Sequence, residues 1–194
     1  MKLLQKIKAT FRLTKSHDIA RRYFVVNGFD GALTMLGLIM GFLFSDVVST
    51  TVILNACLGA AIALGMSGVS SAYVSESAER NRELSKLEGA MIRDLHDSAH
   101  GDAARNVPWL IALVNGSAPL IISLLILLPF FISKAGILFP VSPLYFAIGI
   151  AFFLIFLLGV FLGRISGISW LRSGLQTLLI ATITALLIYL FTEN

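Results

Sequence analysis

The residue with the clearest chemical role is Asp30, a carboxylate inside a long apolar run of the sequence. The run covers residues 23–45, and Asp30 is the only charged residue in it. Placing a charge at the centre of a membrane helix costs about 2.5–3.5 kcal/mol on insertion scales. Membrane proteins accept this cost where the group meets an ion or a proton, and we interpret Asp30 in that way. The alternative is a structural Asp that caps a helix or pairs with a neighbour near one membrane face.

Three further carboxylates follow the second apolar run at helical spacing: Glu76, Glu79 and Glu83. On one continuous helix they lie along one face and repel one another. A multivalent cation bound between them relieves that repulsion, and oxygen ligands suit hard or borderline divalent ions. The alternative is an ordinary solvated helix, in which Glu79 and Glu83 pair with the basic side chains Arg80, Arg82 or Lys86.

His96 and His100 add nitrogen donors to the same charged segment, with aspartates around them. Residues four apart share a helical face, so this pair is compatible with one metal, although the spacing also arises by chance. Gly101 and Pro108 are expected to end this helix before the third apolar run.

The elements that position these groups are membrane helices. Hydrophobic residues make up 57% of the 194-residue chain and charged residues 13%, whereas soluble domains carry roughly 25% charged residues. Each apolar run reaches the ~20 residues that cross a bilayer. The runs are 23–45, 47–75, 106–133, 135–163 and 173–192. Because they are continuously apolar, not alternating, we exclude a β-barrel and predict an all-α integral membrane protein with five spans.

The third run carries Pro119 and Pro129, which are expected to kink or interrupt its helix. Asn115 precedes them and could supply a polar group near mid-membrane. In the fourth run, Gly159 and Gly163 form a small-residue pattern suited to close helix contact.

The basic residues predict the orientation of the chain. All fifteen Lys and Arg except Lys134 lie before the first span, between the second and third, or between the fourth and fifth. The positive-inside rule makes that side cytoplasmic, with the carboxy terminus outside. The net charge of +4 is then explained by topology and contact with anionic lipid, and no nucleic-acid partner is expected.

These observations predict four regions. Apolar residues recur at helical spacing within residues 3–11, which indicates a short helix on the inner membrane surface. The second span is expected to continue without a break into a cytoplasmic helix. The regions are a basic amphipathic segment 1–22, the first two spans in 23–75, a cytoplasmic acidic and His-containing metal-binding helical segment 76–107, and the last three spans in 108–194.

The sequence contains no motif that indicates an enzyme. The sequence has no Ser-His-Asp, Cys-x-x-Cys, Walker-type or dinucleotide-binding motif, so no enzyme and no resident cofactor are expected. Cys57 is the single cysteine and is interpreted as a small packing residue. No cleavable signal peptide is evident, and the compact length suits a prokaryotic plasma (inner) membrane.

Several of these features together resemble a known family. A basic amino terminus precedes the element Asp30-Gly-Ala-Leu-Thr34 in the first span. A small-residue second span with Met66 and Tyr73 follows, then an acidic helix and a third span with Pro119. In this order the chain resembles the prokaryotic membrane branch of the vacuolar iron transporter family over essentially its whole length.

The resemblance implies a five-helix homodimer with a cation path between subunits, which exchanges Fe²⁺ or a related ion (Mn²⁺, Co²⁺ or Zn²⁺) for protons. Asp30 would be the ion ligand and proton acceptor. Met66 would supply a soft thioether that suits Fe²⁺ better than Mg²⁺. The cytoplasmic carboxylates would gather ions before entry; they are Glu76, Glu79 and Glu83.

Two hypotheses follow from the sequence. The first is a dimeric, proton-coupled antiporter that exports Fe²⁺ or Mn²⁺ from the cytosol. The second is a non-transporting membrane scaffold or metal sensor, in which the helix over residues 76–100 binds metal or a partner protein. The first requires Asp30, and the second requires the cytoplasmic carboxylates.

Overall fold

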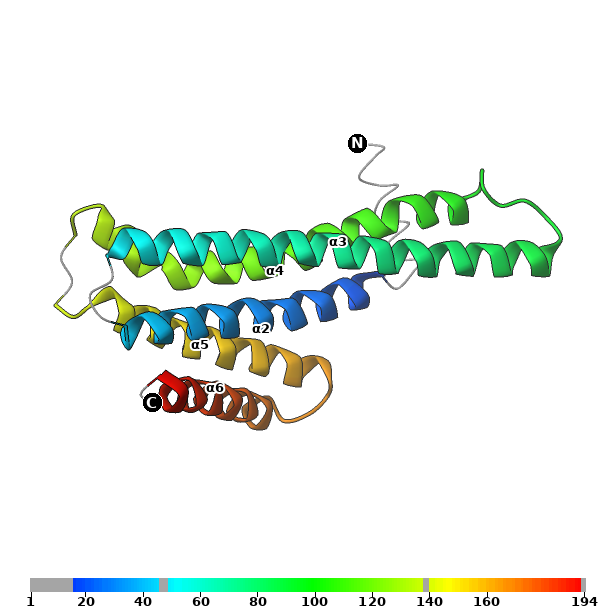
Figure 1. Cartoon of the computed structure of the whole chain (residues 1–194). Coiled ribbons are helices and arrows are strands. Elements are labelled where there is room, and N and C mark those ends of the chain that lie inside the picture. The colour runs from blue at the N-terminus through cyan, green and yellow to red at the C-terminus, as the bar shows by residue number, and fades with distance from the viewer. Residues whose placement is uncertain (1–15, 46–48, 138–139, 193–194) are drawn as a thin grey trace. The chain divides into compact units, whose positions relative to one another are not determined.

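The computed structural model of the chain describes residues 16–45, 49–137 and 140–192, and this part of the chain folds into five helices (Figure 1). All five are long and apolar enough to cross a membrane, and the described residues contain no strand. The all-helical prediction with five spans is therefore confirmed, whereas the helix expected within residues 3–11 lies outside the described residues. The helices are α2 Ser16–Leu43, α3 Thr50–Met91, α4 Ala99–Lys134, α5 Pro143–Ile165 and α6 Trp170–Thr192.

The chain divides into two compact units, and three helices contribute to both. Unit 1 combines Met1–Phe24, described from residue 16 onward, with Met66–Ser117. Unit 2 combines Val25–Gly65 with Ala118–Asn194. Unit 2 holds the larger apolar core, to which α2, α3, α4, α5 and α6 all contribute buried side chains. Unit 1 has two smaller apolar clusters, one of them centred on Val107 of α4.

Helix α3 joins the second span to the charged segment without interruption. It has 42 residues, which at 1.5 Å per residue is about 63 Å, or twice the ~30 Å of hydrocarbon in a bilayer. No Pro, and no Gly between Ser75 and Lys86, interrupts the helical pattern at the point where charges begin. The predicted continuous helix is therefore confirmed. Its charged end, counted from Glu76, extends about 24 Å past the apolar run.

Helix α4 differs from its prediction. It begins at Ala99 and continues to Lys134 through Gly101, Pro108 and both prolines of the third apolar run. The predicted helix end at Gly101 and Pro108 is therefore wrong, and α4 is not interrupted further along. Pro108 and Pro119 are fully buried, so the apolar surface that each ring buries offsets the backbone donor that it removes.

Gly101 has a packing role instead of a terminating one. A Cβ at this position would overlap the backbone oxygen of His96. The glycine therefore lets the first turn of α4 lie directly against the preceding chain. A sequence pattern cannot distinguish this close approach from a helix stop, because both favour a residue without a side chain.

Helices α5 and α6 pair closely in unit 2 (Figure 1). Ser142 caps α5 by accepting a hydrogen bond from the Leu144 N–H at 3.4 Å, and the helix begins at Pro143, later than the start of the apolar run at residue 135. A Cβ at Gly159 would overlap Thr177 of α6, and one at Gly163 would lie 2.7 Å from the Ser173 Cβ. The predicted close helix contact at these glycines is therefore observed.

Candidate functional site

Asp30 projects from the outer face of α2 in unit 2. The residues beside it fix this orientation, because Gly28 and Gly31 are buried against neighbouring helices. A Cβ at Gly31 would lie 2.7 Å from Pro119 Cα of α4, and one at Gly28 would lie 3.3 Å from a Leu158 methyl of α5. The glycine face of α2 is thus held inward, and the Asp30 side chain is exposed on the other face.

Asp30 is exposed at a position well inside the apolar run of α2. It is the fifteenth of the 28 residues of α2 and lies seven residues, or about 10 Å, beyond the start of the apolar run at Tyr23. Hydrocarbon cannot solvate a carboxylate, and ionisable groups inside membranes face other protein groups or a water-filled path. The exposed face of α2 around Asp30 therefore requires a polar counterpart.

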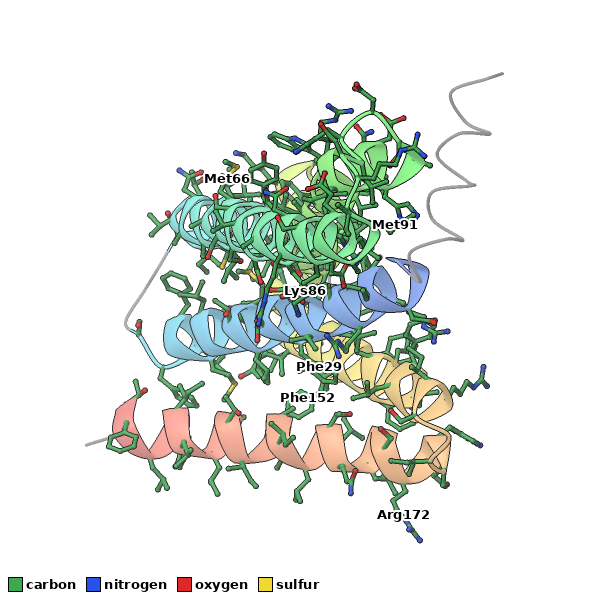
Figure 2. All side chains as sticks on the ribbon, turned by 90° about the vertical axis from the view of Figure 1, so that its right-hand side faces the viewer. Phe29, Met66, Lys86, Met91, Phe152 and Arg172 are labelled. Atoms are coloured by element: carbon green, nitrogen blue, oxygen red, sulfur yellow. The ribbon has the colours of Figure 1, made fainter. Side chains whose placement is uncertain are left out.

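Met66 lies on an exposed face of α3 in unit 1 (Figure 2), with 60% of its surface accessible. The opposite side of α3 is fixed to α4. Asn115 donates a hydrogen bond from Nδ2 to the Gly68 carbonyl oxygen at 2.8 Å, and a Cβ at Gly68 would lie 3.1 Å from Gly116 Cα. The polar group expected at Asn115 thus serves helix packing. This contact leaves the Met66 thioether accessible to an ion or to another protein surface.

An arginine pairs with two of the carboxylates that were expected to bind a cation on α3. Arg80 lies between Glu76 and Glu83 and pairs with both, at 3.6 Å from Glu76 Oε2 and 2.7 Å from Glu83 Oε2. The side chains of Arg80 and Glu76 are only 10% and 9% exposed. Glu83 is half exposed, and Glu79 is exposed. The pairing with a basic side chain that the sequence suggested is therefore observed for Glu83, and the structure adds a pair between Arg80 and Glu76.

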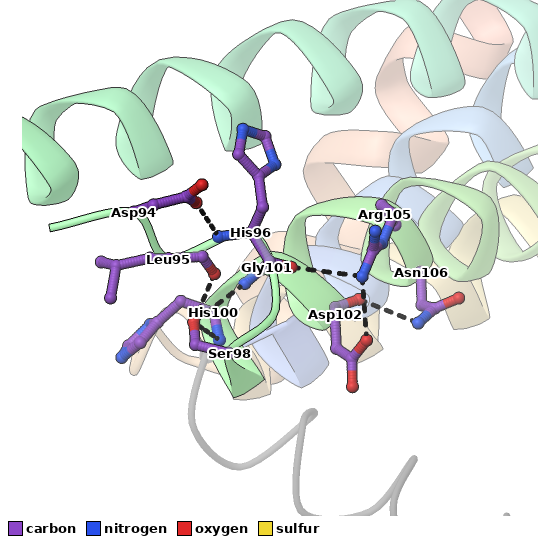
Figure 3. A network of polar contacts seen from close by, with 9 residues as sticks. All are labelled: Asp94, Leu95, His96, Ser98, His100, Gly101, Asp102, Arg105 and Asn106. Atoms are coloured by element: carbon purple, nitrogen blue, oxygen red, sulfur yellow. Dashed lines mark hydrogen bonds and ion pairs between the residues drawn. The ribbon is translucent and has the colours of Figure 1, made fainter.

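The two histidines do not share a helical face. His96 lies in the turn after α3, and His100 lies in the first turn of α4. Figure 3 shows their imidazole rings pointing away from each other. The expectation of one helical metal site for this pair is wrong, because α3 ends at Met91 and the chain reverses before His96. His100 instead lines a small pocket in unit 1, together with Arg80 and Glu83 of α3.

The turn between α3 and α4 brings together a different set of donors. One ligand atom each from Glu88, Asp94 and His96 lie within 4.8 Å of one another. Ile92 adopts φ 52°, a left-handed conformation rare for a β-branched residue. Glu88 was not singled out from the sequence because it belongs to α3, and only the reversal after Met91 places it beside His96. The excess of Asp and His after residue 93 was the one available signal.

Comparisons with known proteins agree with this architecture. A family model described as the VIT family matches residues 82–193, from the charged end of α3 through α6. An uncharacterized protein of Methanocaldococcus jannaschii is 33% identical over 183 residues, which is 93% of this chain and 92% of that protein. The similarity to this relative covers nearly the whole chain, whereas the family match begins after Asp30 and Met66.

Proposed function

Because this chain belongs to the VIT family, the vacuolar iron transporter family of membrane proteins that carry divalent metal ions, we propose that it exports Fe²⁺ or Mn²⁺ from the cytosol in exchange for protons. The observation that carries this proposal is the exposed carboxylate of Asp30 within the apolar part of α2. In a transporter, such a group binds the cation in one step and a proton in the next.

The polar counterpart of Asp30 is, in this proposal, Asp30 of a second copy of the chain. Two identical helices related by a two-fold axis present the same residue to each other, so a homodimer places two carboxylates on one path. One divalent ion neutralises both, and two protons replace it. Exchange of one M²⁺ for two H⁺ moves no net charge, so a single membrane acid per chain is sufficient for electroneutral antiport.

Other residues would contribute to the proposed ion path. The exposed Met66 thioether would favour Fe²⁺ over Mg²⁺, because soft sulfur ligands select transition ions over hard ones. The exposed Glu79 and Glu83 would gather ions at the mouth, whereas Glu76 is held by Arg80 and contributes less. The basic ends of the helices would face the cytoplasm of a prokaryotic cell, with the carboxy terminus outside, so ions gathered there would leave the cytosol.

Liposome flux tests the proposal. The purified protein is reconstituted with an internal pH dye, Fe²⁺ or Mn²⁺ is added outside, and both signals are followed. Metal entry should raise the internal pH as protons leave, and Asp30→Asn should abolish both signals because an amide neither exchanges a proton nor carries a charge. Asp97→Asn, at an exposed position in the turn before α4, is the matched control and should retain both. Undiminished flux in Asp30→Asn would refute this role for Asp30.

A further inference from the structure

Thr34 places a hydroxyl group at the centre of the first span, one helical turn from Asp30. It is the middle residue of the apolar run 23–45. Because it follows Asp30 by four residues, the two side chains project from the same face of α2. Thr34 is partly exposed, whereas Met35 and Ile39 on the inward face are fully buried. Both Asp30 and Thr34 belong to unit 2.

The hydroxyl group of Thr34 has no hydrogen-bond partner among the described residues. A threonine inside a helix commonly donates to the carbonyl oxygen four residues earlier, which for Thr34 is that of Asp30. An unpaired hydroxyl is unfavourable in apolar surroundings, so we expect a partner from outside the described chain. Three threonines of α6 make the usual bond, to Leu178, Ile180 and Ile188; they are Thr182, Thr184 and Thr192.

The face of α2 beyond Thr34 carries two residues without side chains. Gly37 and Gly41 follow Thr34 by three and seven residues, so they continue the same stripe, and both are partly exposed. A Cβ at Gly41 would meet no described atom within 4 Å, and one at Gly37 would meet only a methyl group of Ile188 at 3.7 Å. This face therefore leaves room for an ion beside the Thr34 hydroxyl.

We propose that the Thr34 hydroxyl oxygen is a ligand of the transported ion and that it favours an oxygen-preferring ion such as Mn²⁺. The inference rests on the proposed transport function, in which the ion meets Asp30 on this face of α2. The hydroxyl would replace one water of the hydration shell while the ion passes Asp30. It has lone pairs for the ion but no charge, so it binds weakly enough to let the ion leave, as conduction requires.

A second copy of the chain would double these ligands. In the proposed dimer, each α2 presents the same residues to the two-fold axis. Two Asp30 carboxylates and two Thr34 hydroxyl groups then supply at least four oxygen atoms, a ligand set that suits Mn²⁺. Because the hydroxyl groups are neutral, they leave the exchange of one divalent ion for two protons electroneutral.

The hydroxyl of Thr34 and the thioether of Met66 would favour different ions. Soft sulfur favours ions such as Zn²⁺, whereas water-like oxygen ligands suit Mn²⁺. Loss of the hydroxyl should therefore weaken the transport of Mn²⁺ more than that of Zn²⁺. A general disturbance of the helix packing around Thr34 would instead weaken the transport of both ions, so the ratio between them distinguishes a ligand from a structural residue.

The test measures Mn²⁺ and Zn²⁺ flux into liposomes that contain the full-length protein, over a range of ion concentrations. Thr34→Val keeps the branched shape of threonine and removes the hydroxyl, whereas Thr34→Ser keeps the hydroxyl. Thr184→Val is the matched control, because Thr184 is also partly exposed in a span but donates its hydroxyl to the Ile180 carbonyl oxygen at 2.9 Å. Asp30→Asn is measured beside them to report on the transport function itself.

Thr34→Val should raise the KM for Mn²⁺ by about tenfold, the lower end of the loss in affinity when a group around a metal is removed, and should raise the KM for Zn²⁺ much less. Thr34→Ser and Thr184→Val should behave like the parent protein. An unchanged KM for Mn²⁺ in Thr34→Val, or an equal rise for both ions, would overturn the proposal. If circular dichroism shows that Thr34→Val is unfolded, Thr34→Ala takes its place in the same comparison. Parent-like Thr34→Val beside an inactive Asp30→Asn overturns this inference alone, whereas an active Asp30→Asn overturns the transport function on which it rests.

Discussion

Replacing Arg80 by methionine (Arg80→Met) should strongly destabilise the protein, because it leaves Glu76 buried and without its cationic partner. Methionine keeps most of the length and apolar volume of the arginine stem, so the packing is retained while the charge is lost. The Glu76 side chain is 9% exposed and the Arg80 side chain 10% exposed. Removing one partner of a buried ion pair costs about 3–5 kcal/mol, mainly because the remaining charge is uncompensated.

The other members of the cluster should give smaller effects. Glu83 is half exposed, so its pair with Arg80 is worth about 1 kcal/mol at most after solvent screening. In Glu76→Gln, Arg80 keeps its ion pair with Glu83 at 2.7 Å, so no buried charge is left without a partner and the loss of stability should be smaller than in Arg80→Met. The double variant Arg80→Met/Glu76→Gln should be more stable than Arg80→Met alone, because no buried charge remains without a partner.

The assay is reversible unfolding in mixed micelles, followed by circular dichroism for the parent protein, both single variants and the double variant. The exposed Arg82 supplies a matched control, and Arg82→Met should change the free energy of unfolding by no more than about 0.5 kcal/mol. A loss below about 1 kcal/mol in Arg80→Met, or a double variant no more stable than that single variant, would refute the buried-pair interpretation. Glu76 would then be available as a metal ligand.

Two further predictions concern the proposed path. Gly31→Ala should cost about 1–3 kcal/mol of stability through overpacking, because the new Cβ would lie 2.7 Å from Pro119 Cα. The variant should also lower metal flux, since α2 must move beside Asp30 to relieve this contact. Normal flux together with normal stability would contradict the tight contact. Flux should also be unchanged when valinomycin and K⁺ set the membrane potential, because exchange of one divalent ion for two protons carries no net charge; a rate that rises with potential would contradict that stoichiometry.

The helices were predictable because their signals are local. Continuous apolar runs near the length of a bilayer crossing define the five spans, and the absence of a stop signal after Ser75 predicts the extended α3. The close contact at Gly159 and Gly163 was also predictable, because small residues four apart mark a surface that another helix can approach. The position of Asp30 within an apolar run likewise needs no tertiary information.

The sequence by itself therefore determined the class of the protein, its spans and the one acid within them, since each depends on residues adjacent in the chain or one helical turn apart. Only the tertiary structure decided which donors meet. Arg80 and Glu76 are four residues apart on α3, but their burial is tertiary, because Arg80 lies against the first turns of α4 at Ala103 and Ala104 in unit 1. Glu88 joined His96 because α3 ends at Met91 and the chain turns back there. The second outcome depends on where the chain reverses, and the reversal follows Ile92, which adopts a left-handed conformation that is rare for a β-branched residue and that no sequence pattern predicts.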